Sequence, residues 1–220
     1  MLEPPVLLTF VASQSLGVAA FVFTMMAAVV DNDHTVVETD ENPAEYTFVW
    51  HPVLMSAGMS YLFGCSAVMF RVIRSVDKFH TKLLHTVIHC VALVISLAGF
   101  YLAVAMYSAY DSPHFQTIHG MLGLATVGLF AAQWVISIPV FLWPRAPASI
   151  RAPGISVHIC VGTGVFVCAA ICCLTGFNSR EAKTESSKTY YKVAGLLHVA
   201  FTLVVLYMLS VRKYKRPPEY

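Results

Sequence analysis

Nine histidines are the residues of this chain best suited to chemistry, and most of them lie in apolar surroundings. An ionisable side chain inside a long apolar stretch is costly to bury and usually marks a functional site. His34 and His80 lie in charged connecting segments, where we expect solvated surface side chains. The others lie within or beside apolar stretches: His51, His85, His89, His114, His119, His158 and His198.

Four of these histidines fall into two pairs of matched depth. His51 and His119 each lie three to four residues after the start of an apolar stretch. His89 and His158 each lie seven residues after the basic residue that precedes one. For helices rising ~1.5 Å per residue through a ~30 Å apolar layer, the second pair lies ~10 Å below one surface. The two levels are then ~15–20 Å apart.

Two facing imidazoles at each of two levels are the ligand set of six-coordinate haem iron, which suits electron transfer. Helical bundles build such cofactor sites from side chains on facing helices. A zinc site needs four clustered ligands, often including cysteine or carboxylate, and the spacing supplies no such cluster. We therefore predict two haem groups. His198 has no partner at its depth, so we predict that it packs between helices and forms hydrogen bonds.

The basic residues before the second pair lie on the same helix faces as these histidines. Seven residues are almost two helical turns, so Lys82 lies above His89. By the same spacing Arg151 lies above His158. His85 lies one turn above His89. Two cations and an imidazole favour haem propionates, an anionic reductant, or both. The alternative is that the cations only extend towards the membrane interface.

Six apolar stretches must position these residues, and each is long enough to cross a membrane as a helix. β-Barrel strands would be about half as long and would alternate apolar with polar residues, which no stretch does. Of the 220 residues, 57% are hydrophobic and 12% are charged, about half the charged share of soluble domains. This composition excludes a soluble enzyme, a nucleic-acid-binding protein and a disordered adaptor. The predicted spans of this all-α domain (residues 1–220) are 6–30, 48–70, 83–107, 115–143, 155–177 and 190–210.

The charges that flank the spans predict their direction. One side carries ten basic residues and the other carries four, so the first side is cytoplasmic by the positive-inside rule. Both termini are then cytoplasmic, and we expect no cleavable signal peptide because the N-terminus lacks a basic segment. The inner residues are Arg71, Arg74, Lys78, Lys82, Arg145, Arg151, Arg212, Lys213, Lys215 and Arg216, and the outer ones are Arg180, Lys183, Lys188 and Lys192.

The six cysteines all lie within predicted spans, where we expect small buried apolar side chains. Their spacing matches neither a metal site nor a covalent haem attachment motif. The predicted spans contain no carboxylates, which argues against a proton-coupled transporter.

The segments around the paired histidines resemble the cytochrome b561 family of transmembrane di-haem reductases. The resemblance covers about residues 48–177, whereas the first and last spans agree only in hydropathy and position. The similar segments are Trp50–Met55 (WHPVLM), Lys82–His89 (KLLHTVIH), Ile118–Gly120 (IHG) and Val140–Pro144 (VFLWP), continuing through Arg151 to His158.

The resemblance implies a four-helix bundle, formed by the second to fifth spans, around two b-type haems. It assigns His51 and His119 to the outer haem iron, and His89 and His158 to the inner one. In such proteins cytoplasmic ascorbate gives single electrons to the inner haem. The outer haem then reduces monodehydroascorbate or a ferric chelate across the membrane. Members of the family often form homodimers.

The resemblance also implies two substrate sites. Lys82 and Arg151 match family positions that bind cytoplasmic ascorbate, and we expect His85 beside them. Thr86 stands where many members have a second lysine.

The outer acceptor site is expected at His114, Phe115 and Gln116. Gln116 replaces a tyrosine that many members have in this pocket, and Lys192 lies near the position of a family asparagine. His114 would bind iron, donate a hydrogen bond to ascorbate, or be an ordinary loop histidine.

Two other functions are alternative interpretations of the same histidines. A haem-bearing membrane anchor subunit, which passes electrons between a partner enzyme and quinone, needs a docking surface that the short inner loops do not offer. A non-haem metal transporter with a histidine relay would be expected to have carboxylates within its spans. The expected location is the plasma membrane or an internal vesicle membrane.

Overall fold

The computed structural model describes residues 3–38, 43–179 and 184–215, and every regular element in this part of the chain is a helix. Six helical segments are long and apolar enough to cross a membrane, which confirms the six predicted spans. The predictions for Arg180, Lys183 and Arg216, and for the side chain of His34, lie outside the described residues.

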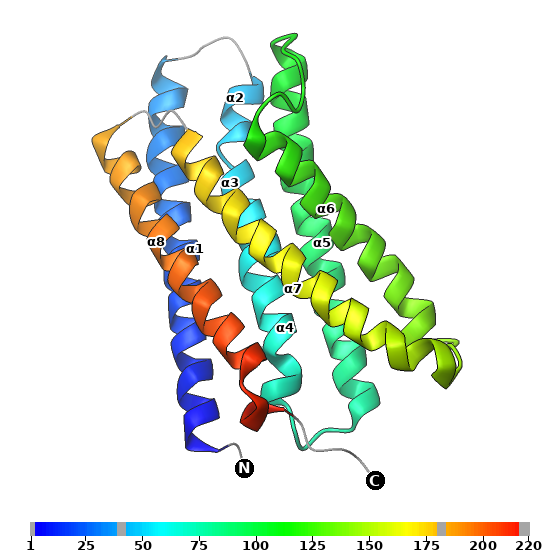
Figure 1. Ribbon diagram of the computed structural model, residues 1–220. Coiled ribbons are helices and arrows are strands. Elements are labelled where there is room, and N and C mark those ends of the chain that lie inside the picture. Colours follow the sequence, from blue (N-terminus) through cyan, green and yellow to red (C-terminus); the bar gives the residue numbers. More distant parts are fainter. Residues whose placement is uncertain (1–2, 39–42, 180–183, 216–220) are drawn as a thin grey trace.

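The second and fourth spans each combine α- and π-helical segments. The elements in chain order are α1 (Pro4–Glu38), α2 (Pro43–Phe48), α3 (His51–Met55), the π-helix η1 (Ser56–Leu62), α4 (Phe63–Val72), α5 (Lys78–Ala109), α6 (Ile118–Ser137), the π-helix η2 (Ile138–Leu142), α7 (Ala148–Ser179), α8 (Glu185–Ser210) and the short 3-10 helix η3 (Arg212–Tyr214) (Figure 1). The second span is therefore α3–η1–α4, and the fourth is α6–η2.

Helix α5 begins at Lys78, earlier than its hydropathy predicts, because Asp77 caps its first turn. The amide of Phe79 donates to Asp77 Oδ1 at 2.7 Å. This hydrogen bond holds the pKa of the exposed Asp77 carboxyl below its ordinary value. The extra turn makes Lys82 part of the helix that carries His89.

Helix α6 begins at Ile118, three residues later than predicted. Thr117 caps it by accepting a hydrogen bond from the amide of Gly120 at 3.0 Å. Phe115 before the cap has a φ of 57° and cannot continue a right-handed helix. His119 therefore lies in the first turn, close to the end of the bundle.

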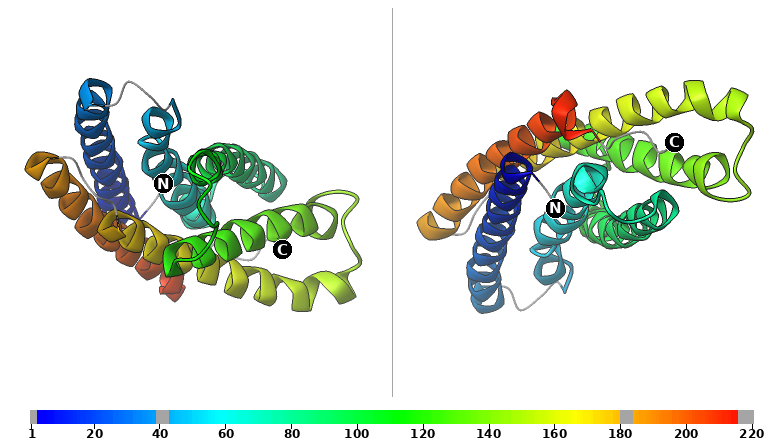
Figure 2. Two further views of the ribbon diagram at one scale, coloured as in Figure 1. Left: turned by 90° about the horizontal axis from the view of Figure 1, so that it is seen from above. Right: turned by 90° about the horizontal axis from the view of Figure 1, so that it is seen from below.

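The helices form one bundle whose two sides differ. Helices α1 and α8 pack along their length on one side, the second span (α3–η1–α4) lies next to them, and α5 packs on that span. Figure 2 shows that α6 and α7 extend away from α1 and α8, towards the segment that connects α6 to α7. The start of α1 and the end of α8 lie at the same end of the bundle (Figure 1). We call this the inner end, because the predicted cytoplasmic residues lie there.

An aromatic layer fills the centre of the bundle. Phe63 packs against Phe130 and Phe166 with ring centroids 5.0 and 5.6 Å apart, and Phe166 packs against Phe201 at 6.1 Å. All four rings are at most 4% exposed. They come from α4, α6, α7 and α8, so this layer joins the helices that carry His119 and His158 to α4 and α8.

Candidate functional site

The structure brings the predicted outer pair together. His51 in α3 and His119 in α6 have ring centroids 6.1 Å apart, and their planes are nearly perpendicular at 89°. His51 also stacks on Phe48 at 5.5 Å. The two imidazoles come from facing helices at the outer end, as the depth argument predicts.

Both outer rings are oriented by hydrogen bonds to backbone carbonyls of neighbouring helices. His51 Nδ1 donates to Gly99 O in α5 at 2.8 Å. His119 Nδ1 donates to Cys172 O in α7 at 3.1 Å and lies 3.3 Å from Thr175 Oγ1. A proton on Nδ1 leaves the lone pair on Nε2, which is the usual arrangement for a metal-binding histidine.

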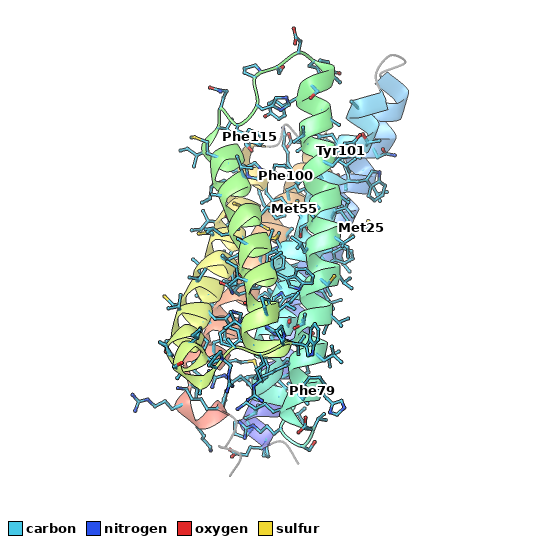
Figure 3. The ribbon with its side chains drawn as sticks, turned by 90° about the vertical axis from the view of Figure 1, so that its right-hand side faces the viewer. Met25, Met55, Phe79, Phe100, Tyr101 and Phe115 are labelled. Carbon is cyan, nitrogen blue, oxygen red and sulfur yellow. The ribbon has the colours of Figure 1, made fainter. Side chains whose placement is uncertain are left out.

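A cavity of about 490 Å³ lies against this pair, and both imidazoles line it. Its volume falls in the ~300–1,000 Å³ range of cofactor and ligand sites. Phe100, Phe115 and Met55 belong to its apolar wall and lie towards the outer end in Figure 3. An apolar cavity with two oriented imidazoles fits a haem group.

The inner pair lies in a cluster of three imidazoles. His85 is 4.5 Å from His89 and 6.3 Å from His158, measured between ring centroids. His89 is 8% exposed and also contacts Phe63 at 4.7 Å and Phe130 at 5.3 Å. The structure thus brings His89 and His158 from α5 and α7 into one cluster, in which His89 is buried.

The ring nitrogens of His89 and His158 are also suited to binding the iron of a haem group. His158 Nδ1 is hydrogen bonded to Ser137 Oγ at 3.0 Å, which orients the ring as the carbonyls do at the outer pair. His89 Nδ1 is buried and has no hydrogen-bond partner among the described residues. Buried polar atoms are seldom left unsatisfied. Coordination of the iron by Nδ1 would satisfy this atom.

His85 lies one turn nearer the inner end than His89 and is half-buried. Its Nδ1 is 3.0 Å from Ser66 Oγ and 3.1 Å from Ser66 O. The ring faces His89 and His158, and Phe70 packs on it at 5.4 Å. It therefore forms a layer between the inner pair and the inner end.

Lys82 and Arg151 each form a hydrogen bond to the segment 141–146, which spans the end of η2 and part of the connection to α7. Lys82 Nζ donates to Phe141 O at 3.2 Å, and Arg151 Nε donates to Ala146 O at 2.8 Å. Each side chain is partly exposed. Two cations from different helices thus lie beside the same short segment, between the inner cluster and the inner end.

The expected outer acceptor residues separate into two groups. His114 and Phe115 line the cavity, whereas Gln116 is exposed and is not among its lining residues. Phe115 stacks on Phe100 at 5.9 Å, and His114 Nε2 lies 3.3 Å from Ser108 Oγ. The Gln116 side chain donates to His114 O at 3.3 Å, so its contact is with the loop itself.

Sequence reasoning did not single out the serines that orient the inner imidazoles. Ser66 and Ser137 lie 19 and 21 residues from their histidine partners. A single serine in an apolar helix has no spacing pattern that would indicate such a contact.

Three expectations for other residues have clear outcomes. His80 is exposed, as predicted, with a side-chain exposure of 69%. His198 forms hydrogen bonds to Ser56 and Ala194, also as predicted. The prediction that every cysteine is buried is wrong for Cys160, which lies on the outward face of α7 and is exposed. An apolar side chain in a membrane helix is stable against lipid, so hydropathy does not distinguish the two environments.

Comparisons with known proteins point to one family. The family described as eukaryotic cytochrome b561 matches residues 50–184. The human lysosomal membrane ascorbate-dependent ferrireductase CYB561A3 is 31% identical over 189 residues, covering 80% of this chain and 78% of the relative. The Danio rerio protein of the same name is 31% identical over 186 residues, covering 77% and 75%. A Sus scrofa protein, transmembrane ascorbate-dependent reductase CYB561, is 31% identical over 175 residues, covering 76% and 69%. The matched range contains all four paired histidines.

Proposed function

Because the chain belongs to the eukaryotic cytochrome b561 family, we propose that it is a transmembrane reductase that carries single electrons from cytoplasmic ascorbate to an acceptor on the other side. The observation that carries this proposal is the grouping of four histidines at two levels. His51 faces His119 at the outer end, and His89 and His158 share the inner cluster.

Each pair would hold one b-type haem, which supplies one-electron redox chemistry when bound. The chain orients the ligands: carbonyls of α5 and α7 hold the outer rings, and Ser137 holds His158. The aromatic layer excludes water between the two levels. No large movement of the helices is needed, because haems at the two levels would together bridge most of the thickness of the bilayer.

Lys82 and Arg151 would bind the ascorbate anion at the inner end. Both cations already donate to backbone carbonyls of the segment 141–146, so each charged group is held beside this segment before any substrate arrives. Hydrogen bonds to a charged partner are stronger than neutral ones. His85 lies between these cations and the inner pair, and would separate the bound anion from the inner ligands.

A ferric chelate is our preferred outer acceptor, with monodehydroascorbate as the alternative. Two of the relatives named above are called ferrireductases. His114 and Phe115 line the outer cavity next to the outer pair, and a neutral imidazole is a suitable iron ligand. Gln116 would act only by holding the loop through His114 O.

The donor site is tested in sealed vesicles that contain ascorbate on the side of the inner end. Replacing Lys82 and Arg151 by alanine should slow haem reduction by ascorbate about 10-fold or more, because each change removes a charge-assisted hydrogen bond of about 1.5–3 kcal/mol. Haem content, measured by the pyridine haemochrome spectrum, should stay unchanged. Lys188→Ala is the matched control, since this exposed lysine pairs with Glu185 at the outer end.

The outcome separates the proposal from its rivals. Loss of haem in the Lys82 or Arg151 variant would contradict a substrate role. A protein whose haem ignores ascorbate but is reduced by quinol would be a membrane anchor subunit. A colourless protein would exclude both functions.

A further inference from the structure

His198 is a buried titratable side chain to which the proposed function gives no role. It lies in α8 and is 1% exposed. Its Nδ1 donates to Ala194 O in the same helix at 2.8 Å. Nε2 therefore accepts, and its donor is Ser56 Oγ at 2.9 Å. This hydrogen bond joins α8 to the second span, 142 residues away in the sequence.

Ser56 occupies the junction at which the second span changes from α-helix to π-helix. It follows α3 directly and is the first residue of η1. Its amide donates to both Pro52 O and Val53 O, in the turn that follows His51. A π-helical turn contains more residues than an α-helical turn, so it rotates the preceding side chains relative to the following ones. The position of this junction thus determines the direction in which His51 points.

His198 also supports the helix segment that orients His119. Phe177 packs on His198 at 5.5 Å and stacks on Tyr191 at 5.4 Å. Phe177 lines the outer cavity together with Cys172, whose carbonyl accepts the hydrogen bond from His119. One side chain of α8 therefore contacts both of the elements that orient the outer pair.

We propose that His198 is a positioning residue for the outer haem, acting through its hydrogen bond to Ser56 and its contact with Phe177. The inference rests on the proposed function, since it takes His51 and His119 as the ligands of the outer iron. Neither α8 nor His198 supplies a ligand. The bond to Ser56 keeps the start of η1 in one register, and His51 keeps its orientation as a result.

Two substitutions of His198 separate its two hydrogen bonds. In His198→Gln the side-chain amide reaches about as far as Nε2 and keeps the bond to Ser56. In His198→Asn the shorter amide reaches only the carbonyl of Ala194. Ser56→Ala removes the same interhelical bond from the other side, and Ser56→Thr restores a hydroxyl.

The experiment uses the purified holoprotein and reads the electron paramagnetic resonance spectrum and the rate of haem loss to apomyoglobin. The signal that disappears in His51→Ala identifies the outer haem. His198→Asn and Ser56→Ala should shift that signal and speed loss of the outer haem roughly threefold to tenfold, less than the ~10–100-fold typical of direct partners of a ligand. His198→Gln and Ser56→Thr should resemble the wild type, and the inner haem should not change.

Two controls measure the effect of burial alone. Thr202→Val changes a buried side chain one turn further along α8. Ser13→Ala changes a fully buried serine in α1 whose hydroxyl donates to Phe10 O in the same helix at 2.7 Å. The inference is overturned if Ser56→Ala leaves the outer signal unchanged, or if both haems respond equally. Survival of the outer signal in His51→Ala would instead overturn the ligand assignment, and with it the proposed function.

Discussion

At the scale of single residues, the two histidine pairs are held in different ways. Carbonyls of adjacent helices orient the outer rings, whereas the hydroxyl of Ser137 orients His158. A carbonyl moves only with its helix, but a hydroxyl rotates with its own side chain. The outer pair is therefore the more sensitive of the two to changes in helix packing.

Gly176 provides a test of this sensitivity. A Cβ atom at this position would lie 2.8 Å from Cε1 of His119, so the ring has to move in Gly176→Ala. Overpacking of this kind costs about 1–3 kcal/mol. We expect the outer haem to bind about 10-fold more weakly, measured by titration of the apoprotein with haem.

Gly164→Ala is the matched control for this change. Gly164 lies in the same helix, and a Cβ atom there meets nothing within 4 Å. Equal losses of haem in the two variants would show that α7 tolerates no added methyl group, and that contact with His119 is not the cause.

At the scale of elements, η1 links the two histidine levels. It lies between α3, which carries His51, and α4. The first residue of α4, Phe63, packs on His89. The other side of η1 packs closely on α5. This segment is also where the second span departs from a regular α-helix, and π-helical turns occur frequently at functional sites.

Gly58 allows the close approach of η1 to α5. A Cβ atom here would lie 2.6 Å from Ala92 O and would also clash with Ser96 Oγ. Because Ala92 O is a backbone atom and cannot turn aside, Gly58→Ala should separate the two helices and destabilise the protein by about 1–3 kcal/mol. We expect a lower melting temperature in detergent and weaker binding of both haems. Gly128→Ala in α6, where a Cβ atom has open space, should leave both properties unchanged.

At the scale of the whole molecule, the fold places the proposed donor and acceptor sites at opposite ends of one bundle. The starts of α5 and α7, which carry Lys82 and Arg151, lie towards the inner end, as do the start of α1 and the end of α8 (Figure 1). The outer pair and its cavity lie near the other end. The proposed direction of electron transfer therefore depends on which end faces the cytoplasm.

Cysteine labelling tests this orientation. Ser75 is exposed between α4 and α5 at the inner end, and Asp111 is exposed between α5 and α6 at the outer end. In intact cells or sealed vesicles of the same sidedness, an impermeant maleimide should label Asp111→Cys directly and Ser75→Cys only after permeabilisation. The unchanged chain gives the background from its own cysteines. The reverse labelling pattern would place the inner end outside the cytoplasm.

The spans and the grouping of the histidines follow from the sequence alone. A membrane-spanning helix needs about 20 apolar residues, so hydropathy determines the spans directly. Depth is proportional to residue number along a helix, so the spacing of His51, His89, His119 and His158 already predicts two levels. The positions of Lys82 and Arg151 above the inner level follow from the same periodicity.

The tertiary structure alone decided how those side chains are held. His51 reaches Gly99, His119 reaches Cys172, and His198 reaches Ser56, over separations of 48, 53 and 142 residues. It also placed His85 within the inner cluster and separated Gln116 from the outer cavity. Such contacts depend on how helices rotate and pack against each other. Hydropathy and helical periodicity describe one helix at a time, so they do not determine those angles.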